Sequence, residues 1–392
     1  MEAKFLPYAR QSIGDEEILQ VSEALKSDLI TRGPAVQFFE EAVARYCGAN
    51  YAVAFQTGTA ALMAAYFAAG LSPHDAVFAP ANTFIASVGM PTQKGIQPNW
   101  IDIEADTGNM DLEILKKGLN YRTTRGRPFI IPVHFSGIPI DMKYLDQLVM
   151  HPGTVIIEDA AHAIGSQYPS GEKVGSCAYS HMTIFSFHPA KVITTGEGGM
   201  VTTNDQTLYH RLRLYRDNGI ERTAPYLRNE EAPGYYEVTD ITGNFNFTSF
   251  QAALGLGQLN RLQTFLDKRR RLVKHYQQQL KNIPHLSLLR EFPDQQQIGY
   301  HLFVVKIDFE AYKTTRRKVM DALQSRGIGT QVHYIPLYRH PIYKGKDEEN
   351  WITLYPNTES YYRQALTLPL YYDLTEEEVN RVCKSLQDVL NE

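Results

Sequence analysis

A lysine between two strand-like segments is the residue whose type and surroundings most suggest chemistry. Lys191 follows the apolar run MTIFSF, which begins at residue 182, and precedes a turn that contains Gly196, Gly198 and Gly199. The β-branched and aromatic residues predict a buried strand, and the glycines predict a sharp turn into a second strand, MVTT. An ammonium group is costly to bury, so such a lysine either extends to solvent or depends on a shifted pKa. Most loop lysines are solvated, so this spacing alone leaves both interpretations open.

Small residues follow the first strand-like run, YAVAFQ, where a helix is expected to begin. Thr57, Gly58, Thr59 and Ala60 lead into the apolar helical pattern ALMAAYFAAG. Free backbone N–H groups at a helix N-terminus, with threonine hydroxyls beside them, suit a phosphate group. An N-capping threonine would give the same letters, so this motif is weak by itself.

Two other strand-like runs, and MTIFSF itself, carry groups that could contact a ligand. Asp159 and His162 follow TVIIEDA, and the aspartate either caps a helix or pairs with a buried ring nitrogen. Phe84 follows AVFAPANT, where it either stacks on a planar ligand or packs in the core. Ser186, five residues before Lys191, either donates to the same phosphate or faces solvent.

Together these residues supply a phosphate cradle, a stacking ring, an acid for a pyridine nitrogen and a lysine for an aldehyde. Those groups are what a protein needs to hold pyridoxal 5'-phosphate (PLP) on a lysine. In open α/β sheets, ligands bind at the carboxyl ends of the strands, which is where these residues are expected to lie. The sequence therefore predicts a PLP site.

The elements that must position this site alternate between strand-like and helix-like patterns. Strands are predicted at YAVAFQ (51), AVFAP (76), FIIPVHF (129), TVIIEDA (154), MTIFSF (182) and MVTT (200). Strands separated by helix-length segments predict an α/β fold with a mostly parallel sheet covered by helices on both faces. Past residue 258 a polar helix over roughly 259–282, the strand-like HLFVVKID and a final helix with a Thr375/Glu378 capping box predict a smaller α+β domain. We therefore expect a large domain over residues 1–257 and a small one over 258–392.

Length, charge and cysteine content narrow the classes of function. A chain of 392 residues exceeds the usual size of a single core, and a formal charge of −4 argues against nucleic-acid binding. The basic run from Lys268 to Arg271 is interpreted as a solvated helix face. Three scattered cysteines give no metal-binding spacing and favour a reducing compartment. With no signal peptide or bilayer-length apolar segment visible, we expect a soluble cytoplasmic protein that binds no metal.

Over nearly its whole length, from Tyr8 to the last helix, the sequence resembles the DegT/DnrJ/EryC1/StrS family of sugar-nucleotide aminotransferases. The resemblance is carried by TGTAAL at 57, ANTFIAS at 81, IEDAAHAIGS at 157, FSFHPAKVITTGEGGMV at 185, LRLYRDNG at 212, AALGLGQL at 252 and LTLPLYYDLT at 366. It implies PLP-dependent transferase fold type I, the aspartate aminotransferase-like fold. It also implies a homodimer with shared active sites.

The family pattern also implies roles for individual residues. Lys191 becomes the Schiff-base lysine, Asp159 the partner of the pyridinium nitrogen and His162 a neighbour of the phenolic oxygen. The remaining implied cofactor contacts are Gly58, Thr59, Ala60, Phe84 and Ser186, with Asn244 reaching the phosphate from the other subunit. The implied substrate contacts are Tyr8, Ile30, Thr31, His333 and Tyr334. The chain departs from the family pattern at Asn246 and Ser249, where arginine and glutamate are usual.

Within the family, SFHPAKVITTGEGG and TQVHYIPLY look most like the PseC-type enzymes of pseudaminic acid biosynthesis. This similarity implies transfer of the amino group of L-glutamate to C4 of a UDP-linked 4-keto-6-deoxy-N-acetylhexosamine. A 4-aminotransferase of the bacillosamine or perosamine type is an alternative, and a non-catalytic sensor on this fold is a weaker one because Lys191 is intact. The sequence leaves open the sugar epimer, the nucleotide and the stereochemistry of the new amine.

Overall fold

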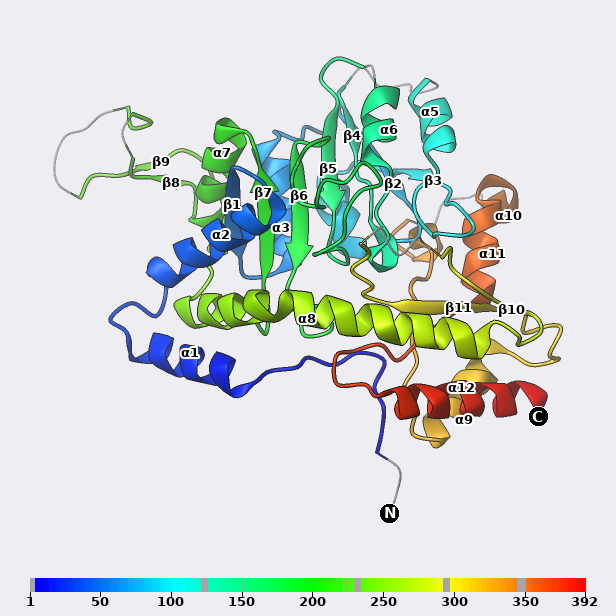
Figure 1. The fold of residues 1–392 in the computed structure, drawn as a ribbon. Coiled ribbons are helices and arrows are strands. Elements are labelled where there is room, and N and C mark those ends of the chain that lie inside the picture. The colour runs from blue at the N-terminus through cyan, green and yellow to red at the C-terminus, as the bar shows by residue number, and fades with distance from the viewer. Residues whose placement is uncertain are drawn as a thin grey trace.

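A seven-stranded sheet forms the centre of the computed structural model, which describes residues 4–120, 126–149, 151–223, 225–228, 234–291, 297–343 and 350–392 (Figure 1). The strand order is β1-β7-β6-β5-β4-β2-β3. The strands are β1 (Tyr51–Phe55), β2 (Ala76–Pro80), β3 (Asn99–Ile101), β4 (Pro128–Ile130), β5 (Val155–Asp159), β6 (Met182–Ser186) and β7 (Gly199–Thr203). Only β7 runs antiparallel to its neighbours, β1 and β6. The predicted mostly parallel sheet is therefore confirmed, with β3 as an additional strand.

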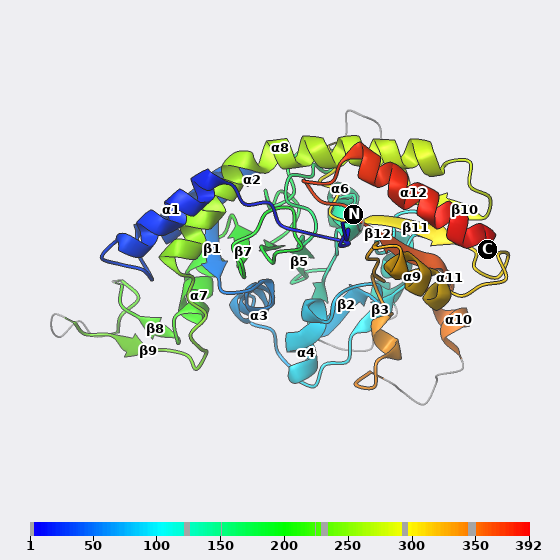
Figure 2. The same ribbon diagram turned by 90° about the horizontal axis from the view of Figure 1, so that it is seen from below.

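Helices cover both faces of this sheet (Figure 2). On one face lie α2 (Pro34–Cys47), α5 (Leu112–Asn120), α6 (Met142–Leu148) and part of α8 (Ser249–Leu280); on the other lie α3 (Gly58–Ala68), α4 (Gly89–Gln93) and α7 (Gln206–Arg216). Side chains alternate along β1, so that Ala52 and Ala54 pack with the first group and Val53 and Phe55 with the second. Both faces are apolar, as expected for a sheet that is buried on each side.

Helix α8 has 32 residues and runs below the sheet and onward to the C-terminal part (Figure 1). It begins at Ser249, ten residues before the expected start at 259, behind a capping box formed by Thr248 and Gln251. Its early turns contain glycines because other helices pack closely there: a Cβ on Gly255 would lie 2.6 Å from the Phe39 ring. The proposed domain boundary, between residues 257 and 258, lies inside this helix, so α8 belongs to both parts.

The C-terminal part combines a small antiparallel sheet with helices. The strands are β10 (Leu286–Leu288), β11 (Phe303–Ile307) and β12 (Ala365–Leu368), and the helices are α9 (Arg316–Ser325), α10 (Trp351–Leu354), α11 (Pro356–Gln364) and α12 (Glu376–Asn391). The capping box of Thr375 and Glu378 starts α12 as expected. The N-terminal α1 (Asp15–Lys26) packs on α8, and β8 (Ile220–Glu221) pairs with β9 (Glu237–Val238) in a separate two-stranded ribbon. Among the described residues, no helix is long and apolar enough to cross a bilayer.

The basic run on α8 is not a uniformly solvated face. Arg269 is only 2 % exposed, and its Nη1 donates to the carbonyl oxygens of Tyr300, His301 and Leu370 at 3.1–3.3 Å. Burial lowers the pKa of this guanidinium to about 10. The expectation of a solvated helix face was wrong for Arg269, because this arginine links α8 to two segments of the C-terminal part.

Candidate active site

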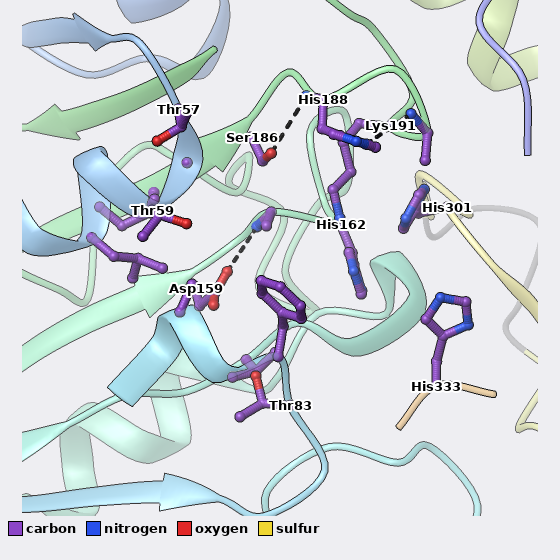
Figure 3. A pocket seen from close by; sticks show the side chains of 18 of the residues that line it. Thr57, Thr59, Thr83, Asp159, His162, Ser186, His188, Lys191, His301 and His333 are labelled. Atoms are coloured by element: carbon purple, nitrogen blue, oxygen red, sulfur yellow. Dashed lines mark hydrogen bonds between the residues drawn. The ribbon is translucent and has the colours of Figure 1, made fainter. Parts of the chain in front are cut away.

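A cavity of about 470 Å³ opens at the carboxyl ends of the parallel strands (Figure 3). Its wall includes Thr57 after β1, Thr83 after β2, Asp159 at the end of β5 and Ser186 at the end of β6. These strands end at the same edge of the sheet because β7, which separates β1 from β6, is antiparallel to both. Of the residues predicted to bind cofactor or substrate, Tyr8, Gly58, Thr59, Phe84, Asp159, His162, Ser186, Lys191, His333 and Tyr334 line this cavity.

One side of the cavity has the features of a phosphate cradle. Thr57 caps α3, and its Oγ1 accepts the amide hydrogen of Ala60 at 3.0 Å. Gly58 and Thr59 are the first two residues of α3, so their amides have no acceptor within the helix. A Cβ on Gly58 would lie 2.9 Å from Cβ of Ser186, so glycine lets this turn approach β6. Ala60 is buried, its amide is already bonded, and it does not line the cavity.

Asp159 is held by hydrogen bonds to both carboxylate oxygens. Oδ1 accepts the amide hydrogen of Ala161 at 3.1 Å, and Oδ2 accepts the hydroxyl hydrogen of Ser87 at 2.6 Å. The side chain is only 5 % exposed and lines the cavity, and no helix begins after it. The helix-capping interpretation therefore does not hold, and Asp159 presents its carboxylate to the cavity.

The neighbour of Asp159 on β5 serves a different purpose. Glu158 is fully buried and accepts hydrogen bonds from Tyr168 (2.6 Å), Thr183 (2.8 Å) and Ser180, while His134 Nε2 lies 2.7 Å away. Burial alone would raise the pKa of Glu158, but the hydrogen bonds, led by that of His134, lower it. Alternate residues of a strand face opposite sides, so this network anchors β5 from behind.

Lys191 lies in the turn between β6 and β7 and lines the cavity. Its backbone N–H donates to the carbonyl oxygen of His188 at 2.8 Å, which shapes the turn. Burial lowers the pKa of its ammonium group to about 8, while the charge of Asp159 opposes this shift. A lysine with this pKa is available as a free amine near neutral pH, which favours the reactive interpretation over the solvated one.

Aromatic and histidine side chains form the opposite side of the cavity from Thr57, Thr59 and Ser186 (Figure 3). His162 Nδ1 accepts the amide hydrogen of Ser136 at 3.3 Å, and Nε2 lies 3.1 Å from the hydroxyl of Tyr334. Because Nδ1 accepts, the proton of the neutral ring is on Nε2 and is donated to Tyr334. Burial lowers the pKa of His162 well below its usual value, so the ring is neutral.

Phe84 is 56 % exposed, although its ring borders the cavity 6.3 Å from that of Tyr334. An apolar ring left this exposed is not part of the core, which supports stacking on a planar ligand. Tyr8 and His333 also line the cavity, and their ring centroids are 5.6 Å apart. The N-terminal segment thus reaches the cavity, as the resemblance implied.

Five residues that were predicted as contacts or as departures from the family pattern do not line this cavity and lie near one another. Thr31 forms an isolated antiparallel β-bridge with Thr248, and the carbonyl oxygen of Ile30 accepts the amide hydrogen of Ser249. Nearby, Asn244 is exposed, and its Oδ1 accepts hydrogens from the backbone (3.2 Å) and side-chain (2.7 Å) nitrogens of Asn246. A backbone N–H can only donate, so the acceptor is the Oδ1 of Asn244 and its NH₂ group is left as a donor. Asn246, where the family usually has arginine, therefore orients Asn244.

Several residues of the site were missed in the sequence. These are Thr83, His188, Glu197 and His301 on the cavity wall and Ser87 behind Asp159. Thr83 and Ser87 are four residues apart in ANTFIAS, a spacing that could have indicated a shared side of a helical turn. His301 comes from the C-terminal part and lies 4.4 Å, between ring centroids, from His162, a proximity with no local sequence signal.

The residues present fit PLP. The amides of α3 and Ser186 suit its phosphate, the ring of Phe84 suits its pyridine face, and Asp159 suits the ring nitrogen. Lys191 supplies an amine of lowered pKa that can react with an aldehyde.

Comparisons with known proteins agree with this geometry. Residues 11–387 match the model of the DegT/DnrJ/EryC1/StrS aminotransferase family. The chain is 35% identical to the spore coat polysaccharide biosynthesis protein SpsC of Bacillus subtilis, over 98% of this chain and 97% of SpsC. It superimposes on Helicobacter pylori PseC, an aminotransferase involved in the biosynthesis of pseudaminic acid, with a TM-score of 0.86, 26% identity and 99% coverage of both chains.

A third relative bears on the cofactor. Spr1654 of Streptococcus pneumoniae has been solved in a PLP form and in a PMP form. The PLP form superimposes with a TM-score of 0.86 and 28% identity over 98% of both chains. The chain therefore belongs to the DegT/DnrJ/EryC1/StrS aminotransferase family, as a sugar aminotransferase of fold type I with PLP as its cofactor.

Proposed function

We propose that the protein transfers the amino group of L-glutamate to C4 of a UDP-linked 4-keto-6-deoxy-N-acetylhexosamine, as PseC-type enzymes do. The observation that carries the reaction type is Lys191, whose pKa is lowered to about 8 in a cavity that it shares with Asp159. The structural similarity to PseC supports the choice of sugar. The two half-reactions use the same cavity, so the kinetics are expected to be ping-pong.

The roles of the chain's own side chains follow from their chemistry. PLP, when bound, supplies an aldehyde for condensation with amines and a pyridinium ring that withdraws electrons. The Asp159 carboxylate accepts the ring N–H and stabilises its positive charge. Lys191 Nζ, as a free amine, would take a proton from Cα of the donor, and as the resulting ammonium group it would give that proton to the cofactor carbon that receives the amino group. Phe84 and the amides of α3 hold the ring and phosphate in place.

A second candidate is a 4-aminotransferase that acts on another nucleotide sugar, of the bacillosamine or perosamine type. The specific observation in its favour is that SpsC, a polysaccharide biosynthesis protein, is 35% identical to this chain, compared with 26% for PseC. Both candidates share the lysine chemistry and differ only in the sugar that the cavity accepts.

We also propose a homodimer in which Asn244 of one subunit reaches the cofactor phosphate of the other. Asn244 is exposed and does not line its own chain's cavity, and its NH₂ group is left as a donor because Oδ1 is the atom that accepts from Asn246. Leu29, Ile30, Phe38 and Ile241 are large apolar side chains that are 49–93% exposed, and exposed apolar surface of this kind is typical of an interface.

The cysteines are buried free thiols, and we place the reaction in the cytoplasm.

The reaction type is tested by borohydride reduction of the holoenzyme and peptide mapping. The pyridoxyl group should be found on Lys191, and the Lys191→Ala variant should incorporate none. A label on any other lysine of the wild-type protein would overturn the assignment.

The substrate is tested by incubating the protein with L-glutamate and a panel of UDP- and dTDP-linked 4-keto sugars. Mass spectrometry and NMR should detect a new amine at C4 of the UDP-linked N-acetylhexosamine, with 2-oxoglutarate formed in equal amount. Preference for a different sugar in the panel would favour the second candidate. If Lys191 is labelled but no 4-keto sugar is aminated, the proposed substrate class is wrong.

A further inference from the structure

Two buried hydroxyl groups stand in line behind the carboxylate of Asp159. The Oγ of Ser87 lies 2.6 Å from Asp159 Oδ2, and the Oγ1 of Thr83 lies 2.7 Å from the Oγ of Ser87. Ser87 is fully buried and Thr83 is 1 % exposed. The three side chains come from different parts of the sheet edge, since Asp159 ends β5 and the other two follow β2.

The direction of these hydrogen bonds follows from the number of protons. An ionised carboxylate can only accept, so Ser87 donates its single hydroxyl hydrogen to Asp159. The bond between Ser87 and Thr83 must then be donated by Thr83. Because Thr83 has used its own hydrogen, the oxygen that it presents at the cavity can only accept.

The backbone around Ser87 is fixed, so its hydroxyl cannot easily turn away. Ser87 lies in the short helix η1 (Ile85–Val88), and its N–H donates to the carbonyl oxygen of Phe84 at 3.1 Å. Its carbonyl oxygen accepts the hydroxyl hydrogen of the fully buried Tyr66 at 2.6 Å. The donor that anchors Asp159 is therefore held from both sides.

We propose that Thr83 and Ser87 form a hydroxyl relay that holds the Asp159 carboxylate in one orientation toward the cofactor ring, with Oδ2 accepting from Ser87. Ser87 acts on Oδ2 directly, and Thr83 acts only through Ser87 by orienting its hydroxyl. Ala161 anchors Oδ1 in the same way. This inference rests on the proposed role of Asp159, and it assigns Thr83 and Ser87 as positioning residues.

The relay predicts unequal and non-additive effects on PLP affinity. Ser87→Ala removes one hydrogen bond to a charged group and should raise the dissociation constant of PLP about 10- to 100-fold. Thr83→Val removes a bond between neutral groups and should raise it by about 2- to 10-fold. The double variant should be no weaker than Ser87→Ala, because Thr83 has no route to Asp159 once Ser87 is gone. Thr83→Ser, which keeps the hydroxyl, should restore normal affinity.

The dissociation constants are measured by fluorescence titration of apoprotein with PLP, and thermal unfolding of each apoprotein is recorded alongside. The matched control is Thr92→Val, because the Thr92 hydroxyl bonds to Val88 and Tyr343 on the same side of the sheet without reaching Asp159. This control should leave PLP affinity unchanged. If Thr83 and Ser87 had only a structural role, each loss of PLP affinity would be matched by a lower unfolding temperature of the apoprotein. Thr83→Ser and Thr83→Val would then bind PLP with the same affinity.

The outcomes distinguish the relay from the proposed role of Asp159. If Asp159→Asn keeps full PLP affinity, the role of Asp159 itself fails. If Asp159→Asn weakens binding but Ser87→Ala and Thr83→Val do not, the relay alone fails. Additive losses in the double variant would show that Thr83 acts independently of Ser87, which also contradicts the relay. Should Ser87→Ala fail to fold, Thr83→Val against Thr83→Ser still decides the question.

Discussion

The lowered pKa of Lys191 makes a quantitative prediction about how fast PLP attaches to the apoprotein. Burial moves this pKa from 10.5 to about 8. At pH 7, about one Lys191 in ten is then uncharged, compared with about one in 3,000 for a lysine of ordinary pKa, a ratio of about 300. Because only the free amine attacks an aldehyde, the rate constant should rise about fivefold from pH 7 to pH 8, about twofold more by pH 9, and then level off.

The assay is stopped-flow absorbance after mixing apoprotein with excess PLP between pH 7 and pH 9.5. Free Nα-acetyllysine is the control, because its amine reacts with the PLP aldehyde in the same way but is fully solvated. Its rate constant should keep rising across this pH range. In Asp159→Asn the break should move to lower pH, since the charge of Asp159 raises the pKa of Lys191. A wild-type rate that climbs without a break to pH 9.5 would refute the argument from burial.

Three further predictions test other parts of the site. Gly58→Ala places a Cβ 2.9 Å from the Cβ of its neighbour on β6 and should weaken PLP binding by about 5- to 100-fold, whereas Gly89→Ala, with open space around it, should not. Mixed and re-equilibrated Lys191→Ala and Asn244→Ala subunits should recover activity above the sum of the two separate variants; heterodimers without this gain would exclude a shared site. Glu158→Gln should lower the free energy of unfolding of the apoprotein in urea by about 3–5 kcal/mol at pH 7. Because the pKa of Glu158 is lowered on folding, this difference should shrink as the pH falls below about 4.5, and a difference that is constant with pH would contradict it.

The sheet could be predicted from the sequence because its strands are short apolar runs between turn signals. The exception is β3, in which only Ile101 of three residues is buried, too little for a pattern of period two. The start of α8 was placed too late because Gly255 and Gly257 are poor helix formers. These glycines are needed for tertiary packing, because a side chain at Gly255 would collide with Phe39 on α2 and one at Gly257 would collide with Glu17 on α1.

The site was predictable where its residues follow strands in order. Lys191, Asp159 and Gly58 carry their chemistry in local motifs, and the structure brings them to one cavity. Ser87 and His301 could not be assigned in the same way. Their contacts, to Asp159 and His162, join segments 72 and 139 residues apart, and a serine or histidine has many other uses in a sequence.

Helix α8 makes the mechanical separation of the two parts difficult. Leu262, Phe265 and Leu266 pack into the core beneath the large sheet, while Leu272, Val273, Tyr276 and Leu280 pack into the core of the C-terminal part. Unravelling either end would cost hydrogen bonds along one continuous helix of about 48 Å. Loss of either core therefore removes support from the other, which favours cooperative melting in one transition. The backbone amides at the middle of α8 should then be among the last to exchange with deuterium, since their exposure requires the whole chain to open.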